Sequence, residues 1–217
     1  MIRMLMRGGL DRMLAGARWA RTWMAVRGKG RFLTYGRNLH IGARTHLSAP
    51  DHLNIGDEVY IGKDVYISAN ATIGDYCMIA NRVAFVGRDD HDYSFVGLPI
   101  RFAPWIGDEE YPAELRHREV NLDSDVWVGY GAILLTGIHV GRGAIVAAGA
   151  VVTKDIPAYA IAAGNPAHIV GHRFISEEEQ HRHEQAIKDG RFRISERDRA
   201  HFVVEPGMGG GPHRPGA

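Results

Sequence analysis

One histidine stands in the most chemically suggestive part of the sequence, an acidic stretch outside any regular pattern. His91 is preceded by Asp89 and Asp90 and followed by Asp92. An imidazole beside a carboxylate is suited to accept a proton near neutral pH, because the carboxylate fixes the tautomer and stabilises the imidazolium. The pattern predicts a general base at His91, with Asp90 or Asp92 as its partner. A histidine in an acidic loop is also often a plain solvated side chain, and spacing alone leaves both interpretations open.

The elements that must position His91 come from a six-residue repeat on both sides of this stretch. An aliphatic residue recurs every six positions, and a second small or aliphatic residue follows each one four places later. Two inward residues in six fit neither the period of a helix nor that of a flat strand. They predict a prism in which each hexad is a strand and a corner, and three hexads make one coil. The leading residues are Ile55, Ile61, Ile67, Ile73, Ile79, Phe85, Leu122, Val128, Leu134, Val140, Val146 and Val152.

This repeat predicts a mostly β protein, a parallel β-helix of about five coils over residues 36–170 with strands stacked at about 4.8 Å. The residue after each aliphatic is expected at a corner, where backbone freedom or the lack of a Cβ is needed. Ser176 and Glu179 form a capping-box signature, so residues 171–204 are expected to form a helical C-terminal extension. Residues 205–217 are expected to be disordered. The corner positions are Gly56, Gly62, Gly74, Gly129 and Gly141.

Residues 87–120 carry no hexad pattern and are predicted to form one inserted loop. A loop of this length in a compact repeat fold is usually functional or disordered, and its many apolar residues favour order. Tyr93, Phe102 and Trp105 are candidates to wall a pocket for the acceptor substrate.

Composition sets broad limits on the function. The chain has 217 residues and a formal net charge of +1, so it can bury one sizeable core and its charge balance argues against a nucleic-acid protein. The single cysteine, Cys77, falls on an inward hexad position and is expected to be a core residue. The chain has neither an apolar run of signal-peptide length nor a membrane span, so a cytoplasmic protein is expected.

Residues 1–31 depart from the even charge balance of the rest. They contain eight basic residues against Asp11 alone, interleaved with Leu, Met and Trp, and residues 1–35 are predicted to be a basic amphipathic helical segment. Such a segment can lie on an anionic membrane as a peripheral contact at its inner face. It can equally pack across the end of the solenoid and cover its open strand edges.

Three histidines six residues apart invite a metal interpretation. His40, His46 and His52 each precede an aliphatic residue and are expected to stack on one outer face. Three residues in a straight column do not converge on a tetrahedral centre, so a surface ladder or a subunit contact is the preferred interpretation, and no metal site is predicted.

The second half of the repeat carries a more specific resemblance. The stretch DVWVGYGAILLTGIHVGRGAIVAAGAVVTKDIPAYAIAAGNPA, together with the earlier FVGRDDHDY, resembles the hexapeptide-repeat acyltransferases over residues 36–175. Within them the chain is most similar to the xenobiotic acetyltransferases, which act on chloramphenicol and streptogramin, and to polysaccharide O-acetyltransferases. The resemblance implies a left-handed parallel β-helix, a homotrimer with active sites between neighbouring prisms, acetyl-CoA as co-substrate and no metal requirement.

The same resemblance implies a role for individual residues. His91 matches the family's catalytic histidine, although Arg88, Asp89 and Asp90 precede it where the family often has Gly or Asn, which leaves its carboxylate partner open. The thioester and pantetheine arm of acetyl-CoA would be contacted by Trp127 and Gly129. The other implied cofactor contacts are backbone groups of Ala147, Ala148 and Gly149, the Lys154 ammonium near the phosphates, and the Asn165-Pro166 turn.

The resulting hypothesis is an O-acetyltransferase that acts on a hydroxyl of a carbohydrate, either a surface polysaccharide or a lipid-linked sugar. An antibiotic acetyltransferase of the chloramphenicol type shares the machinery and differs in the acceptor pocket. Outside this class, the same solenoid could serve as a zinc hydratase or as an inactive scaffold.

Overall fold

The computed structural model describes residue 16 and residues 19–106, 108–109, 111 and 117–189, and the backbone alone for residues 192–196 and 199–204. The predicted disordered tail, residues 205–217, and residues 1–15 and 17–18 of the predicted N-terminal segment lie outside the described residues.

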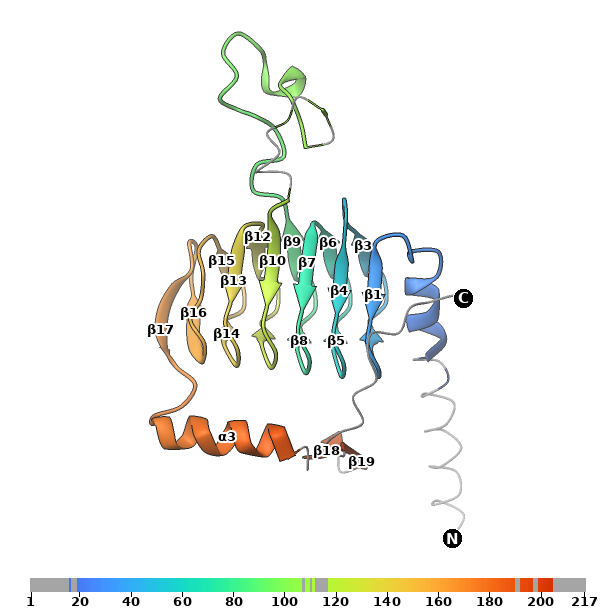
Figure 1. Ribbon diagram of the computed structural model, residues 1–217, viewed down its shortest axis with the longest axis vertical. Helices are drawn as coiled ribbons and strands as arrows, with labels where there is room; N and C mark the ends of the chain where they lie inside the picture. The colour runs from blue at the N-terminus through green and yellow to red at the C-terminus, as the bar shows by residue number, and fades with distance from the viewer. Residues whose placement is uncertain are drawn as a thin grey trace.

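The described chain forms a triangular solenoid built from three parallel ladders (Figure 1). Sheet A contains β1 (Leu33–Tyr35), β4 (Leu53–Ile55), β7 (Asn70–Ile73), β10 (Glu119–Leu122) and β13 (Ile138–Val140). Sheet B contains β2 (His40–Ile41), β5 (Tyr60–Ile61), β8 (Met78–Ile79), β11 (Trp127–Val128), β14 (Ile145–Val146), β16 (Ala160–Ala163) and β17 (His168–His172). Sheet C contains β3 (His46–Ser48), β6 (Tyr66–Ser68), β9 (Ala84–Val86), β12 (Ile133–Leu135) and β15 (Val151–Val152).

The remaining elements lie outside the coils. They are the 3₁₀ turn η1 (Ile100–Phe102), helix α3 (Glu177–Asp189), and a hairpin of β18 (Phe192–Glu196) and β19 (Arg199–Val204). The Glu179 backbone N–H donates to Ser176 Oγ at 3.3 Å, and Glu179 Oε2 accepts from the Ile175 N–H at 3.0 Å. The predicted capping box is therefore present at the start of α3.

Strand register confirms three hexads per coil. Leu53 pairs with Ala71, and Val120 pairs with Ile138, so each partner lies 18 positions further along the chain. Ala71 and Val120 also pair, although they are 49 positions apart, and the loop therefore adds 31 residues to one coil. Because the repeat resumes in register after this insertion, the loop can leave the solenoid without disturbing the ladder.

The core is the column of inward aliphatic residues that the hexads predict. Phe85 is the largest side chain in it, and Ile61, Ile79 and Val128 are all fully buried. Cys77 is also buried, and its Sγ donates to the Asp123 carbonyl oxygen at 3.1 Å. Burial raises the pKa of the Cys77 thiol to about 12, because a thiolate inside the prism would lose its hydration. The predicted core position of this cysteine is confirmed.

The glycines at the corners are required because there is no room for a Cβ. The glycines after the aliphatic residues do not have positive φ; instead, a Cβ on them would collide with the next coil, as at Gly129, where it would lie 2.6 Å from the Ala148 nitrogen. The left-handed residue comes two positions later and is often not glycine, as at Asp64 and Tyr76. Of the two reasons expected for glycine at these corners, the structure therefore shows the lack of a Cβ.

The three regularly spaced histidines do not stack on one face, so that expectation was wrong. His40 lies on β2 in sheet B, His46 lies on β3 in sheet C, and His52 directly precedes β4 in sheet A. A step of six residues turns one corner, whereas residues on the same face are 18 or 20 positions apart. His40 instead stacks on Tyr60, with ring centroids 4.7 Å apart, and His46 on Tyr66 at 4.9 Å.

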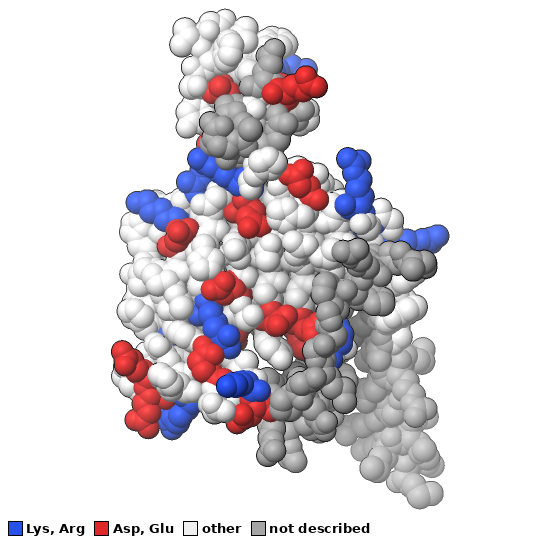
Figure 2. Space-filling model, viewed as in Figure 1, with Lys and Arg blue, Asp and Glu red and all other residues white. Residues whose placement is uncertain are grey.

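Both ends of the solenoid are closed by other parts of the chain. At the first coil, residues 19–26 form a helix in which Val26 is buried in the core and Thr22 Oγ1 accepts from the Ile41 N–H at 3.1 Å. At the last coil, β17 runs antiparallel to β16 and ends the parallel ladder. None of the helices in the described residues is long and apolar enough to cross a membrane. Figure 2 shows acidic and basic side chains interspersed over the face that contains sheet A.

Candidate active site

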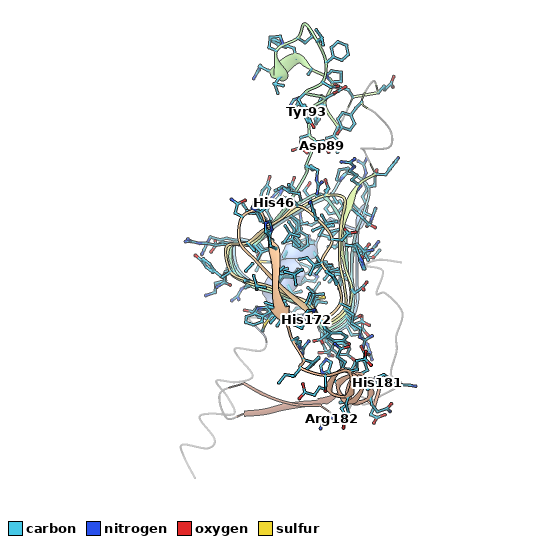
Figure 3. The ribbon with its side chains drawn as sticks, turned by 90° about the vertical axis from the view of Figure 1, so that its left-hand side faces the viewer. His46, Asp89, Tyr93, His172, His181 and Arg182 are labelled. Carbon is cyan, nitrogen blue, oxygen red and sulfur yellow. The ribbon has the colours of Figure 1, made fainter. Side chains whose placement is uncertain are left out.

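The inserted loop leaves the solenoid after β9 and returns at β10, so it arises at the edge between sheets C and A. It projects away from the prism, with Asp89 near its base and Tyr93 further out (Figure 3). The contacts at the base of this loop help to decide where the imidazole of His91 lies.

Asp89 connects the two ends of the loop. Its carboxylate accepts from Arg118 Nη1 at 2.6 Å, and its carbonyl oxygen accepts from the Tyr111 hydroxyl. Burial, followed by the nearby charges of Asp89 and Asp90, raises the pKa of Tyr111, so this hydroxyl keeps its proton as a donor. The sequence had indicated Asp89 only as part of an acidic run. Its pairing with a basic residue at the far end of the unpatterned segment was the signal that reasoning from spacing missed.

Arg88 connects the loop to the next two coils. Its backbone N–H donates to the buried hydroxyl of Thr136 at 3.1 Å, and its Nη2 donates to the Thr153 carbonyl oxygen at 2.5 Å. One residue earlier, a Cβ on Gly87 would collide with the Asp90 carboxylate, so the glycine allows this side chain to fold back against the backbone. Both contacts place the start of the loop along the edge where Thr153 follows β15.

His91 is half-buried and lies in a short two-stranded part of the loop. It forms an isolated antiparallel bridge with Trp105, and the Asp92 N–H donates to the Pro104 carbonyl oxygen at 2.7 Å. His91 Nδ1 lies 3.4 Å from the carbonyl oxygen of Ala103, which is buried. When Nδ1 carries the proton and donates to this oxygen, Nε2 is left as the basic nitrogen.

The hydrogen-bond partner of His91 Nδ1 is thus a main-chain carbonyl oxygen. The sequence had suggested the carboxylate of Asp90 or Asp92 for this role. The Asp92 carboxylate accepts instead from the Ser94 N–H at 3.0 Å and the Ser94 hydroxyl at 2.5 Å. A carbonyl fixes the tautomer as a carboxylate would, but it adds no negative charge to stabilise the imidazolium.

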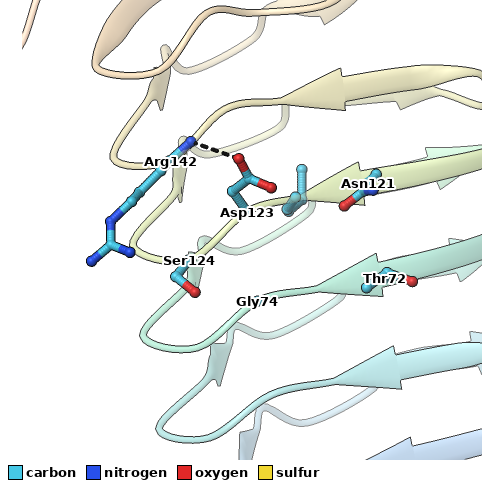
Figure 4. A pocket seen from close by; sticks show the side chains of 7 residues that line it. Thr72, Gly74, Asn121, Asp123, Ser124 and Arg142 are labelled. Atoms are coloured by element: carbon cyan, nitrogen blue, oxygen red, sulfur yellow. Dashed lines mark hydrogen bonds between the residues drawn. The ribbon is translucent and has the colours of Figure 1, made fainter.

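The predicted acceptor wall is an exposed surface in the isolated chain. Tyr93, Phe102 and Trp105 all lie on the loop and are largely exposed to solvent. A hollow of about 360 Å³ lies elsewhere, on sheet A, and is lined in part by Thr72, Asn121 and Arg142 (Figure 4). The three aromatic residues form at most one wall of a pocket within a single chain.

Trp127 and Gly129 lie on and directly after β11. The Trp127 side chain points outward from sheet B and is half exposed. Ala147 and Gly149 follow β14, the next strand of this sheet. The Ala147 N–H donates to the Ala162 carbonyl oxygen and the Gly149 N–H donates to the Tyr130 carbonyl oxygen, both at 2.8 Å. These two amides are already used inside the solenoid, and the Ala147 carbonyl oxygen accepts from the Ala150 N–H at 3.2 Å. The Ala148 amide and the carbonyl oxygens of Ala148 and Gly149 are therefore the groups that this corner could offer to a ligand.

The last predicted cofactor residues lie at the end of sheet C. Lys154 follows β15 and is exposed. The Asn165-Pro166 bond is cis, and the turn around it is tied to β15 because the Val151 N–H donates to the Gly164 carbonyl oxygen at 2.9 Å. The Asn165-Pro166 turn and Lys154 therefore lie at the two ends of one short strand.

The prism separates the predicted catalytic and cofactor residues. Each coil runs from sheet A through sheet B to sheet C, and His91 is on a loop that projects from the edge between sheets C and A. Trp127 lies on sheet B, the face opposite that edge. One chain therefore does not bring His91 and Trp127 together, although it does bring the base of the loop to Thr153, beside Lys154. In the described part of the chain, no group of three or more His, Cys, Asp or Glu residues is placed to hold a metal ion.

Comparison with known proteins also identifies the six-residue repeat in this chain. The family described as bacterial transferase hexapeptide (six repeats) matches residues 52–85, and the hexapeptide repeat of succinyl-transferase matches residues 123–154. The chain is 37% identical to a chloramphenicol acetyltransferase of Agrobacterium fabrum over 107 residues, which are 47% of this chain and 51% of that protein. It is 53% identical over 51 residues to a tetrahydropyridine-dicarboxylate N-acetyltransferase of Staphylococcus aureus, covering 24% of this chain and 21% of that protein.

A solved structure with a similar fold is AntD, an N-acyltransferase from Bacillus cereus in complex with dTDP and 3-hydroxybutyryl-CoA. It superposes with a TM-score of 0.52 over 72% of this chain and 79% of that chain, at 19% identity. Two segments of the chain thus match hexapeptide-repeat models of bacterial transferases, and its fold is the left-handed parallel β-helix. It spans about half the length of the chloramphenicol acetyltransferases that it matches.

Proposed function

We propose that this protein is a CoA-dependent O-acetyltransferase that moves the acetyl group of acetyl-CoA to a hydroxyl of a carbohydrate. The observation that carries the proposal is the placement of His91, half-buried in the described part of the loop with Nδ1 facing a carbonyl oxygen and Nε2 left as the base. The acetyltransferases among its relatives support the acetyl donor.

The proposed reaction needs no covalent enzyme intermediate. His91 Nε2 removes the proton of the acceptor hydroxyl as its oxygen attacks the thioester carbonyl carbon. Main-chain N–H groups stabilise the oxyanion of the tetrahedral intermediate. The intermediate then expels the CoA thiolate, which takes the proton from the imidazolium, so His91 returns to its starting state. Binding both substrates in one cleft supplies much of the acceleration.

The proposed assembly is a homotrimer whose sites lie between neighbouring chains. The separation of His91 from Trp127 by the width of the prism supports this, because two chains packed side by side can bring the loop of one to sheet B of the next. In such a site Trp127 and Gly129 contact the thioester arm, Ala147, Ala148 and Gly149 line the pantetheine, and Lys154 and the Asn165-Pro166 turn lie toward the nucleotide. Tyr93, Phe102 and Trp105, exposed in the single chain, wall the acceptor.

A second candidate acceptor is an antibiotic of the chloramphenicol type. It is favoured by the 37% identity to the chloramphenicol acetyltransferase of Agrobacterium fabrum. The exposed aromatic residues of the loop could stack on a sugar or on a flat drug, so the panel of acceptors must contain both.

The test is thiol release from acetyl-CoA with a panel of sugars, sugar nucleotides and chloramphenicol, for wild type and His91→Ala. Release that requires an acceptor, and that falls by at least about a hundredfold in His91→Ala, is expected for a general base. Near-normal turnover of His91→Ala would refute the assignment of the base. Failure of the wild-type protein to bind CoA would refute the proposed acyltransferase activity.

A further inference from the structure

The helix of residues 19–26 has one face against the solenoid and one face in solvent. Val26 and Thr22 form the inner face through their contacts with the first coil. Trp19, Trp23 and Met24 form the outer face, with 69%, 45% and 64% of their surfaces exposed. The two indole rings stack, with centroids 6.5 Å apart. Covering the end of the prism thus leaves this helix with an apolar face that the solenoid does not bury.

Basic side chains lie beside this apolar face and in the residues that directly follow the helix. The Arg27 guanidinium lies 4.9 Å from the centre of the Trp23 ring, and Lys29 Nζ lies 6.0 Å from the Phe32 ring. No acidic residue occurs between Asp11 and Asp51 in the sequence, although the whole chain has a net charge of only +1. The positive charge is therefore concentrated at this end of the solenoid.

The next two basic residues along the chain are neutralised by carboxylates. Arg37 pairs with Asp57 at 2.8 Å, and Arg44 pairs with Asp64 at 2.6 Å. Within the described residues, no carboxylate forms an ion pair with Arg27, Lys29 or Arg31. These three cations are available to an anionic partner, and the indoles beside them are suited to the boundary between lipid headgroups and acyl chains.

We propose that residues 19–31 dock the protein on the surface of an anionic phospholipid bilayer. Trp19, Trp23 and Met24 enter the headgroup region, while Arg27, Lys29 and Arg31 lie among the lipid phosphates. The helix lies at the β1 end of the stack, so the solenoid stands with that end on the membrane (Figure 1). The loop arises midway along the stack and stays accessible from the side. This inference does not depend on the proposed acetyl transfer, because lipid binding is measured without turnover.

The experiment is flotation of the full-length protein with vesicles of phosphatidylcholine alone and of phosphatidylcholine mixed with phosphatidylglycerol. We expect binding to the mixed vesicles only, with a blue shift of tryptophan emission. Binding should be lost near 1 M salt, where the screening length falls to about 3 Å. Lys29→Glu changes the charge by two units and should lower partitioning about 25-fold, since each charge near an anionic surface contributes about a fivefold effect. Replacing both indoles, in Trp19→Ala/Trp23→Ala, should remove most of the emission shift.

The matched controls are the same kinds of substitution, a charge reversal and the truncation of an apolar side chain, at positions away from the helix. Lys188→Glu makes the same change in net charge on α3, and Ile175→Ala truncates an exposed apolar side chain. Both should bind like the wild type, and circular dichroism should show that every variant is folded. Equal binding by wild type and Lys29→Glu, equal binding to neutral vesicles, or absence of binding would each overturn the proposal. So would an emission shift that depends on protein concentration without lipid, which would indicate a second copy of the chain.

Discussion

The carboxylate of Asp89 and the guanidinium of Arg118 meet at 2.6 Å, although 29 positions of unpatterned sequence separate them. Their pairing joins the two ends of the inserted loop above the edge of the prism. Asp89 is two residues from His91, so this ion pair fixes the position of the backbone that carries the imidazole.

Arg118→Ala is expected to lower turnover about tenfold while changing the melting temperature by no more than a few degrees. The pair is partly exposed, at 38% and 16% for the two side chains, so its own contribution to stability is about 0.5 kcal/mol. Its effect on catalysis is larger because loss of positioning alone can slow a reaction strongly. Thiol release and thermal melting measure the two effects.

The control for this prediction is Arg37→Ala. Arg37 forms a similar pair with Asp57, with exposures of 44% and 18%, but on the first coil and away from the loop. Turnover should be unchanged in this variant. A similar loss of turnover in both variants would mean that Arg118 matters only for general stability.

Mixing two inactive variants tests whether the active site lies between chains. His91→Ala and Trp127→Ala should each be inactive alone. Trimers reassembled from an equal mixture should recover about a quarter of the wild-type turnover, since some interfaces then combine an intact His91 with an intact Trp127. Recovery is measured by thiol release after denaturation and refolding of the mixture. A mixture that stays inactive, although it forms mixed trimers, would place the site within one chain.

Gly129→Ala should destabilise the fold by about 1–3 kcal/mol, because the new Cβ would meet main-chain atoms of the next coil and neither backbone can move freely. The distances are 2.6 Å to the Ala148 nitrogen and 2.8 Å to the Val146 carbonyl oxygen. Gly171→Ala is the control, since nothing lies within 4 Å of its Cβ position. Equal melting temperatures for the two variants would contradict the close packing of the coils.

Cys77 should make the stability of the protein depend on pH in the alkaline range. Burial raises the pKa of its thiol from 9.0 to about 12, so the unfolded state loses this proton first as the pH rises. Its stabilising contribution is complete below pH 9 and is lost above it, by up to about 1.4 kcal/mol per pH unit. Urea unfolding of wild type and Cys77→Ala between pH 8 and 10 measures the difference. Parallel pH profiles for the two proteins would show that the native thiol is accessible to water.

Much of the fold could be predicted from the hexads, because each repeat position has one environment. The inward aliphatic residues, the buried Cys77, the capping box at α3 and the inserted loop all followed from local pattern. The predicted column of histidines was wrong for a geometric reason. The prediction assumed that residues six positions apart lie on the same face. Each hexad instead turns a corner, so His40, His46 and His52 belong to three different sheets.

The sequence by itself thus determined the solenoid, the residues of its core and the position of the one histidine in an acidic loop. Only the tertiary structure decided that Ala103 faces His91 Nδ1, that Arg118 holds Asp89, and that Trp127 lies across the prism from the loop. The physical reason is that the repeat is a local periodicity, which the residues of each coil satisfy by themselves. Contacts in the loop and across the prism join residues far apart in the chain, and their pairing depends on how the coils stack.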